Sequence, residues 1–341
     1  MNPTTTTAGR AGLLLALAAG LTAGLAPTAT TIRFAPEEGL SLTKTFATST
    51  SAELDDMTFE MGGEELELPE IPEINIRSTE TIVFEDTYDA VADGRPTQLT
   101  RAFSELDRSR NETFPGEGGE LTDNDIEETS ELTDTVVVFT WDEDDEEYTA
   151  AFDEDADGDE ELLEGLWCDA DVLGFLPDDE VEEGDTWEVD VEHYTIFFSP
   201  SGDLTFLDQD GNSSRDEIDE EIEESLDGEI ECELESVEDG LATISVTIEV
   251  EGSGDTEQEL EGDGEMVDGG TATRAVEVAS EYEGTLVWDL RAGHMVSFEL
   301  VGESEVSISE GVTLDITTGD TFEQVQTMYF TSETEIEVTF E

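Results

Sequence analysis

Apolar and polar residues alternate along most of this chain. Residues 229–234 read Glu-Ile-Glu-Cys-Glu-Leu, and residues 336–340 read Ile-Glu-Val-Thr-Phe. Successive side chains of a strand point to opposite faces, so this alternation is typical of antiparallel strands with one buried and one solvated face. The clearest hairpin pairs residues 80–91 with residues 97–108 around a turn that contains Asp93-Gly94. The pattern therefore predicts a mainly β protein.

Two segments depart from the alternation and predict short helices. Apolar residues recur at helical spacing between residues 162 and 170. A capping box formed by Ser214 and Glu217 opens the second helix. Its apolar stripe is narrow, so we expect this helix to lie at a sheet edge or rim. The residues of that stripe are Ile218, Ile222 and Leu226.

The order of these elements predicts curved antiparallel sheets or half-barrels in two halves, each with one short helix. Residues 32–176 form the first half and residues 177–341 the second. The boundary falls here because the ring of Pro177 cannot continue a helix. One continuous domain is the alternative. Polar, glycine-rich stretches at residues 111–130 and 252–270 predict loops.

Residues 176–187 carry the most specific pattern in the chain, Leu-Pro-Asp-Asp-Glu-Val-Glu-Glu-Gly-Asp-Thr-Trp. This stretch resembles the Leu-Pro-x-x-x-Val-x-x-Gly-Asp-x-Trp motif of a family of exported bacterial proteins of unknown function, common in planctomycetes. Shorter pieces are similar too, at residues 34–39, 93–96, 99–101 and 284–289. The resemblance implies an exported, β-rich protein, and it supplies no catalytic residue.

The local pattern of this motif predicts how its apolar residues are placed. Val181 is the one apolar residue of an acidic loop, so we expect it to point inward. Gly184-Asp185 predicts a tight turn whose glycine takes a positive φ. Trp187 would then fill a core, and the alternative is an exposed aromatic that stacks on a ligand.

Charge changes this picture most. The sequence has 93 acidic and 11 basic residues, a net charge of −82, and a single lysine, Lys44. Because the acids alternate with apolar residues, they predict an acidic outer face rather than disorder. Such a face repels itself unless ions screen it, and the Debye length falls from about 10 Å at 0.1 M salt to about 3 Å at 1 M. We therefore expect a halophilic-type surface, and we exclude nucleic acid and anionic membrane surfaces as partners.

The first 31 residues have the pattern of a secretory signal peptide. Arg10 precedes an apolar stretch, residues 11–26, that is short for a membrane span. Small residues at positions 26–31 offer cleavage sites. An uncleaved N-terminal anchor is the alternative. We therefore predict export to the periplasm, the cell envelope or the extracellular medium.

Residues 153–164 fit the calcium-loop pattern Asp-x-Asp-x-Asp-Gly-x5-Glu. The candidate ligands are Asp153, Asp155, Asp157 and Glu164. Their oxygens are the hard ligands that calcium prefers. Two features depart from an EF-hand: position 8 is Glu160, and the preceding residues predict a strand. The alternative to a calcium site is a solvated turn in which Asp159 caps the following helix.

No motif predicts enzymatic chemistry. The sequence lacks a nucleophile elbow, a phosphate-cradling glycine loop and a zinc-protease motif. Cys168 and Cys232 are the only cysteines, and they fit either a disulfide or two buried thiols. We therefore predict a non-enzymatic binding or scaffolding module, with an apolar groove for a lipid, a hydrophobic peptide or another envelope protein. A calcium-stabilised envelope protein is the alternative.

Overall fold

The computed structural model describes residues 29–66, 71–115, 121–153, 158–213, 217–261, 267–318 and 321–341. The strands are β1 (Ser41–Met61), β2 (Glu64–Glu65), β3 (Asn75–Ala92), β4 (Arg95–Pro115), β5 (Leu121–Ser130), β6 (Val136–Asp142), β7 (Glu147–Phe152), β8 (Thr186–Val189), β9 (Phe206–Asp208), β10 (Asp227–Glu238), β11 (Leu241–Glu261), β12 (Val267–Asp289), β13 (His294–Ile316) and β14 (Thr321–Phe340). The helices are the 3-10 helices η1 (Glu160–Leu163), η2 (Leu173–Phe175) and η3 (Val191–Phe197) and the α-helix α1 (Glu217–Glu224).

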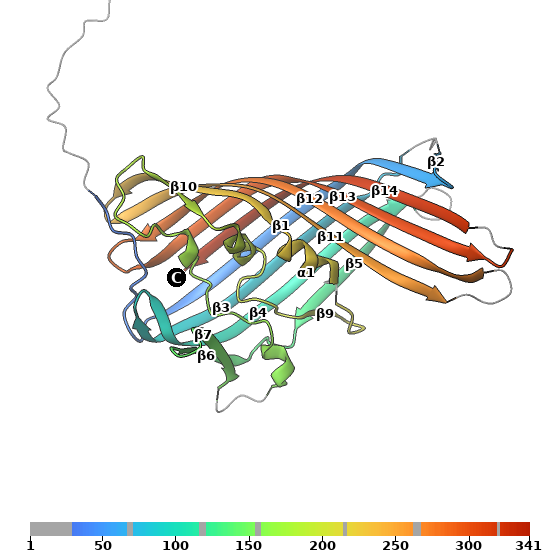
Figure 1. Cartoon of the computed structure of the whole chain (residues 1–341). Coiled ribbons are helices and arrows are strands. Elements are labelled where there is room, and N and C mark those ends of the chain that lie inside the picture. Colours follow the sequence, from blue (N-terminus) through green and yellow to red (C-terminus); the bar gives the residue numbers. More distant parts are fainter. Residues whose placement is uncertain are drawn as a thin grey trace, which may run out of the picture.

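All fourteen strands belong to one curved antiparallel sheet (Figure 1). Its order is β7-β6-β4-β3-β1-β14-β13-β12-β11-β10-β8, with β2 paired to β1 and β5 paired to both β4 and β9. Within the described part of the chain the end strands β7 and β8 do not pair, so the sheet stays open. The predicted mainly β class is confirmed.

Hairpin connections build most of this sheet. The predicted hairpin between β3 and β4 is present, and Ala92 pairs with Arg95 across a turn in which Asp93 and Gly94 take φ values of 51° and 77°. Strand β1 pairs with β14 along most of its length. This pairing joins the first and last strands of the chain, so strands from both sides of Pro177 lie in the same sheet.

The two loop predictions are wrong where the structure describes them. Residues 111–115 complete β4, residues 121–130 form β5, and residues 252–261 and 267–270 lie in β11 and β12. The physical reason is that a long partner strand supplies backbone hydrogen bonds whatever the side chains are. Polar and glycine residues therefore extend strands that apolar residues begin.

Of the two helix predictions, one is wrong and the other is confirmed. The helical spacing at residues 162–170 yields only the 3-10 turn η1, which Asp159 caps by accepting a hydrogen bond from the Glu161 N–H. Helix α1 forms as predicted, although Ser214 of the capping box lies outside the described residues. It also lies at an edge of the sheet as predicted, because β10 pairs with β11 only as far as Glu251, and beyond that point the Asp255 N–H donates to Glu221 of α1. The apolar run after β8 forms η3.

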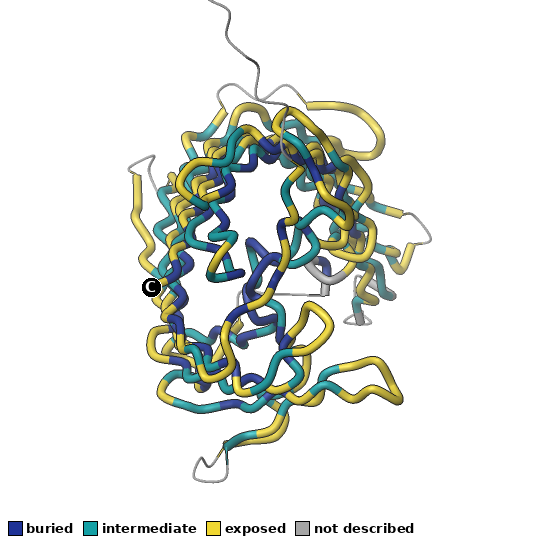
Figure 2. Tube along the Cα trace, turned by 90° about the vertical axis from the view of Figure 1, so that its left-hand side faces the viewer, coloured by how far each residue is buried: buried dark blue, intermediate teal, exposed yellow. Residues whose placement is uncertain are grey.

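Buried residues gather on the inner, concave face of the sheet, as the end-on view in Figure 2 shows. At one end of the strands this face is covered by residues 158–205, which we call the covering segment. Phe197 of this segment stacks on Phe298 of β13 with ring centroids 4.3 Å apart. Val181 points inward as predicted and is 7% exposed. Trp187 is half-buried, and its indole N–H donates to the Phe175 carbonyl.

The fold begins close to the end of the predicted signal peptide. Residues 1–28 lie outside the described residues. Thr30 exchanges two backbone hydrogen bonds with Val181, and Ile32 and Phe34 are buried. Across the described ranges, no helix has the length and apolar character needed to span a membrane.

Candidate ligand-binding groove

A groove of about 390 Å³ opens on the inner face, between α1, η3 and the strands β11 and β12. Its apolar lining residues are Tyr194, Phe198, Ile222, Leu226, Val250 and Val278. Thr195, Ser199 and Ser280 add hydroxyl groups, and Arg108, Glu223 and Glu251 lie at its margin. Apolar walls with few polar groups are typical of small-molecule sites.

Helix α1 forms one wall of the groove because β11 carries glycines beneath it. A Cβ added at Gly254 would lie 2.8 Å from the Ile218 carbonyl oxygen, and one at Gly252 would lie 3.1 Å from a Leu226 methyl carbon. Side chains at these two positions would push the helix away. The glycines therefore allow the narrow stripe of α1 to approach the sheet.

Two aromatic rings of the covering segment, Tyr194 and Phe198, line the groove and pack against a third ring, Tyr282. Tyr194 and Phe198 of the covering segment lie 4.9 Å apart, and each ring centroid is 6.0 Å from that of Tyr282 on β12. Burial and the neighbouring Tyr282 raise the pKa of Tyr194 above its ordinary value. The ring therefore stays uncharged near neutral pH and presents an apolar face to the groove.

Arg108 closes one end of the groove, and its charge is already neutralised. Its Nε donates to Glu80 at 2.7 Å, its Nη1 lies 4.0 Å from a Glu128 carboxylate oxygen, and its guanidinium stacks 4.4 Å from the Phe206 ring centroid. Burial raises the pKa of Glu80, and Arg108 opposes that rise. This end of the groove is therefore polar without carrying an excess positive charge.

A larger hollow of about 850 Å³ lies over the outer face of the neighbouring strands. Exposed carboxylates line it, among them Asp55, Asp227, Glu251, Glu277 and Glu305. Acidic side chains on an outer face are expected throughout this chain, so the hollow does not distinguish a ligand. The smaller inner groove is the better candidate, because it is apolar in a protein that has 93 acidic residues.

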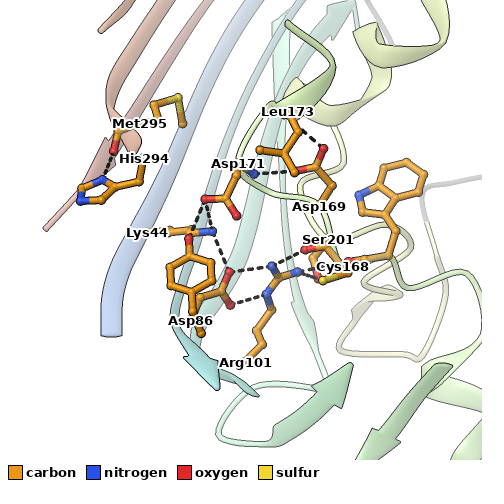
Figure 3. A network of polar contacts seen from close by, with 12 residues as sticks. Lys44, Asp86, Arg101, Cys168, Asp169, Asp171, Leu173, Ser201, His294 and Met295 are labelled. Carbon is orange, nitrogen blue, oxygen red and sulfur yellow. Dashed lines mark hydrogen bonds and ion pairs between the residues drawn. The ribbon is translucent and has the colours of Figure 1, made fainter. Parts of the chain in front are cut away.

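A buried ion network joins the three strands β1, β3 and β4 to the covering segment (Figure 3). Lys44 of β1 places its Nζ 2.8 Å from Asp86 on β3 and 2.9 Å from Asp171. Arg101 of β4 binds both oxygens of Asp86, at 2.7 and 2.8 Å. Burial alone would raise the pKa of Asp86, but Arg101 and Lys44 lower it below its ordinary value.

The same network holds the covering segment through its backbone. Arg101 donates to the carbonyl oxygens of Trp167 and Cys168 and to the Ser201 hydroxyl. Tyr88 donates to Asp171 at 2.6 Å. Because η3 lies between these anchored points in the sequence, the network fixes the wall of the groove that carries Tyr194 and Phe198.

Asp169 adds a third carboxyl beside this network. Its two oxygens accept the backbone N–H groups of Asp171 and Leu173. Burial and the neighbouring Asp171 raise the pKa of Asp169 to about 6. Asp169 therefore titrates close to neutral pH, beside the anchor of the covering segment.

Calcium binding by residues 153–164 stays a prediction. Asp155 and Asp157 lie outside the described residues, Asp153 is half-buried at the end of β7, and Glu164 is exposed. Among the residues that the structure describes, no group of three His, Cys, Asp or Glu side chains is placed to hold a metal ion. Asp159 caps η1, which is the arrangement expected of the alternative, a solvated turn.

The two cysteines are buried free thiols rather than a disulfide. Cys168 lies in the covering segment and Cys232 on β10. Burial raises the pKa of Cys168, and it raises the pKa of Cys232 to about 12. Both side chains therefore act as apolar packing groups.

The ion network and most of the groove were not predicted from the sequence, although the sequence contains a signal for the network. Lys44 stands between Leu42 and Phe46 at the inward positions of a strand. Asp86 and Arg101 occupy equivalent inward positions on β3 and β4. A charged residue at an apolar position of an alternating strand indicates a buried partner of opposite charge.

No protein-family model and no curated protein matches the chain. Among solved structures, an outer membrane channel from Pseudomonas putida F1 is similar at 8% identity and a TM-score of 0.26, covering 90% of this chain and 97% of that one. The protein OccK7 from Pseudomonas aeruginosa is similar at 7% identity and a TM-score of 0.20, covering 88% of this chain and 99% of that one. Similarity at this level does not establish a common fold or function.

Proposed function

We propose that this protein is an exported, non-enzymatic binding module of the cell envelope that holds an elongated apolar ligand in its inner groove. The observation that carries the proposal is the groove itself, which keeps about 390 Å³ open between α1, η3 and the sheet. An acyl chain or another flexible apolar chain fits its shape and lining.

The distribution of charge supports an apolar ligand. Exposed positions of the strands carry most of the carboxylates, whereas Val250, Val278 and Leu226 line the groove. Transfer of apolar area out of water contributes about 25 cal/mol per Å². High salt strengthens this contribution when the anion is excluded from protein surfaces.

A neutral fluorescent probe tests the proposal. N-phenyl-1-naphthylamine, titrated into the protein in about 1 M salt, should show saturable enhancement with one site per chain. Val278→Trp fills the groove and should weaken probe binding at least tenfold. Glu277→Trp is the matched control, because it places the same bulk one residue away on the outer face, and it should bind as the wild type does.

The thermal midpoint of each variant shows whether it is folded. Ile222→Gln changes the α1 wall without adding bulk, and it serves as a second variant that should also weaken the probe. Probe binding that does not saturate in the wild type contradicts the proposal. Equal binding by wild type and a folded Val278→Trp variant contradicts it as well.

A further inference from the structure

The inner face of β12, β13 and β14 changes character along the strands. Close to the covering segment it is packed core, represented by Leu286, Phe298 and Val338. The next two rows across the strands carry hydroxyl groups, and the rows after them are apolar again. These zones follow from the strand register, which places the residues of each row side by side.

We call the middle zone the hydroxyl belt. One of its rows is Ser280, Ser304 and Ser332, and the other contains Tyr282, Thr334 and Thr50. Within it, Ser280 donates to Ser304 at 2.8 Å, the Tyr282 hydroxyl lies 3.1 Å from that of Ser304, and the hydroxyls of Thr50 and Thr334 are 3.0 Å apart. Ser280 also lines the groove, so the belt begins at the groove floor.

Ser332 has hydrogen-bonding capacity that the described residues do not use. It is 7% exposed and lies directly opposite Ser304 on the inner face. None of the hydrogen bonds among the described residues involves its side chain. Its hydroxyl is not one of the fully buried polar atoms that lack a partner, so water reaches it, and a polar group of a bound molecule would take the place of that water.

Beyond the belt the inner face forms an apolar strip. Val278, Val306 and Phe330 make its first row, and Ile308 and Met328 belong to the second. All but Phe330 are half-buried. The strip continues the groove wall at Val278, so a chain leaving the groove would stay on apolar surface.

Charge in this region disfavours an anionic head group. Neither row of the hydroxyl belt contains a charged residue on β11 to β14 or β1. The cation that lines the groove, Arg108, is already paired with Glu80. Arg110 of β4, which continues the row of Thr50, lies 3.1 Å from a Glu112 carboxylate oxygen. A carboxylate or phosphate would therefore lose its hydration without gaining an unpaired cation.

From this arrangement we propose that the ligand is an uncharged amphiphile, such as an acylglycerol, whose hydroxyl or ester head group binds the hydroxyl belt at Ser280, Ser304 and Ser332. Its acyl chain then lies along the groove and the apolar strip. This inference rests on the proposed function and adds the chemical class of the ligand and its orientation.

A pair of ligands with the same acyl chain tests the inference. Monooleoylglycerol and oleate, each below its aggregation concentration, compete with bound N-phenyl-1-naphthylamine at pH 8 in about 1 M salt. The salt screens the repulsion between oleate and the acidic outer face. Monooleoylglycerol should displace the probe at a concentration at least tenfold lower than oleate. Ser332→Ala should reduce the ratio between the oleate and monooleoylglycerol concentrations that displace the probe several-fold. Ser307→Ala, on the outer face of β13, should leave this ratio unchanged.

The outcomes separate the two proposals. Displacement by oleate at the same or lower concentration overturns the uncharged-head inference and leaves the apolar groove in place. Failure of both lipids to displace a bound probe overturns the inference too. Absence of saturable probe binding contradicts the proposed function itself. An unchanged ratio in a folded Ser332→Ala variant overturns the placement of the head group.

Discussion

Lys44 and Asp171 form a buried ion pair although they stand 127 positions apart in the sequence, with Nζ and Oδ1 separated by 2.9 Å. Lys44 is the only lysine of a chain with 93 acidic residues, and it lies in the interior, at 0% exposure. A lysine kept out of water in this way is bound by its partners and contributes nothing to solubility. The pair therefore links the sheet to the segment that forms the groove wall.

Removing the lysine should destabilise the protein strongly. Lys44→Met leaves the carboxylates of Asp86 and Asp171 buried with one cation fewer, which costs about 3 to 5 kcal/mol in comparable pairs. Urea unfolding in about 1 M salt measures the change. Lys44→Met combined with Asp171→Asn should recover part of the loss, because the network is neutral again.

Arg77→Met is the matched control for this experiment, since Arg77 lies on the exposed face of β3. We expect it to change the unfolding free energy by less than about 1 kcal/mol. Equal effects of Lys44→Met and Arg77→Met would contradict a structural role for the buried network.

Five glutamates lie side by side across the outer face, one on each of the strands β10 to β14. The row consists of Glu229, Glu249, Glu281, Glu303 and Glu333. Like charges directly opposite each other destabilise a sheet. Glu281→Gln removes the central charge and should raise the thermal midpoint by about 2 °C at low salt, with little effect at about 1 M salt.

Glu283→Gln is the control for this row. Glu283 lies on the same face of β12, and its direct neighbours are Thr247 and Val301. It should raise the midpoint by less than Glu281→Gln does at low salt. A wild-type midpoint that does not rise between low and molar salt would contradict the prediction of a salt-requiring surface.

Asp169 should give the protein a component of stability that decreases as pH rises. Its folded-state pKa of about 6 is above the value of about 3.9 expected in an unfolded chain. Between these values the folded protein binds a proton that the unfolded chain has lost, so this component is present below pH 4 and is lost through pH 6. The contribution of Asp86 to stability depends on pH in the opposite direction, because its folded-state pKa is lowered.

Asp169→Asn cannot ionise and should lack that component. From pH 4 to pH 7.5 the wild type should lose about 2 kcal/mol relative to the variant. Chemical unfolding of both proteins across this range, in about 1 M salt, provides the comparison. Parallel curves for the two proteins would show that Asp169 does not titrate in this way.

The two thiols should be inert in the folded protein. A pKa of about 12 for Cys232 leaves about a thousandth of the thiolate that an unfolded cysteine has near pH 8. Alkylation should therefore be at least about 1,000-fold slower before unfolding than after it. Intact mass should show two labelled thiols after unfolding without reductant, and a mass that needs reductant for labelling would indicate a disulfide.

The alternation of residues made the strands predictable, because period two is a local property of the chain. Predictions from this alternation were wrong where contacts between distant parts of the chain determined the secondary structure. Residues 121–130 pair with β4 despite their polarity, and Gly252 and Gly254 stay in a strand because β12 pairs with them. The helix predicted near Leu166 does not continue past η1, because Gly165 takes a φ of 75°, which is not a helical angle.

The candidate site was less predictable than the fold. Inward charges at Lys44, Asp86 and Arg101 could have indicated a buried network, but the register that joins them to Asp171 depends on the loop path. The groove arises from α1 and η3 meeting over β11 and β12. No pattern in the sequence of either helix specifies how far apart the two helices lie.

Photolabelling tests the central claim, that the inner groove holds an apolar chain, most directly. An alkyl chain carrying a diazirine, irradiated with the protein in about 1 M salt and mapped by peptide mass spectrometry, should label Phe198, Leu226 and Val278. Excess monooleoylglycerol should suppress the labelling. Labels spread over the outer face, or labelling of the groove residues that competitor does not reduce, would contradict the account.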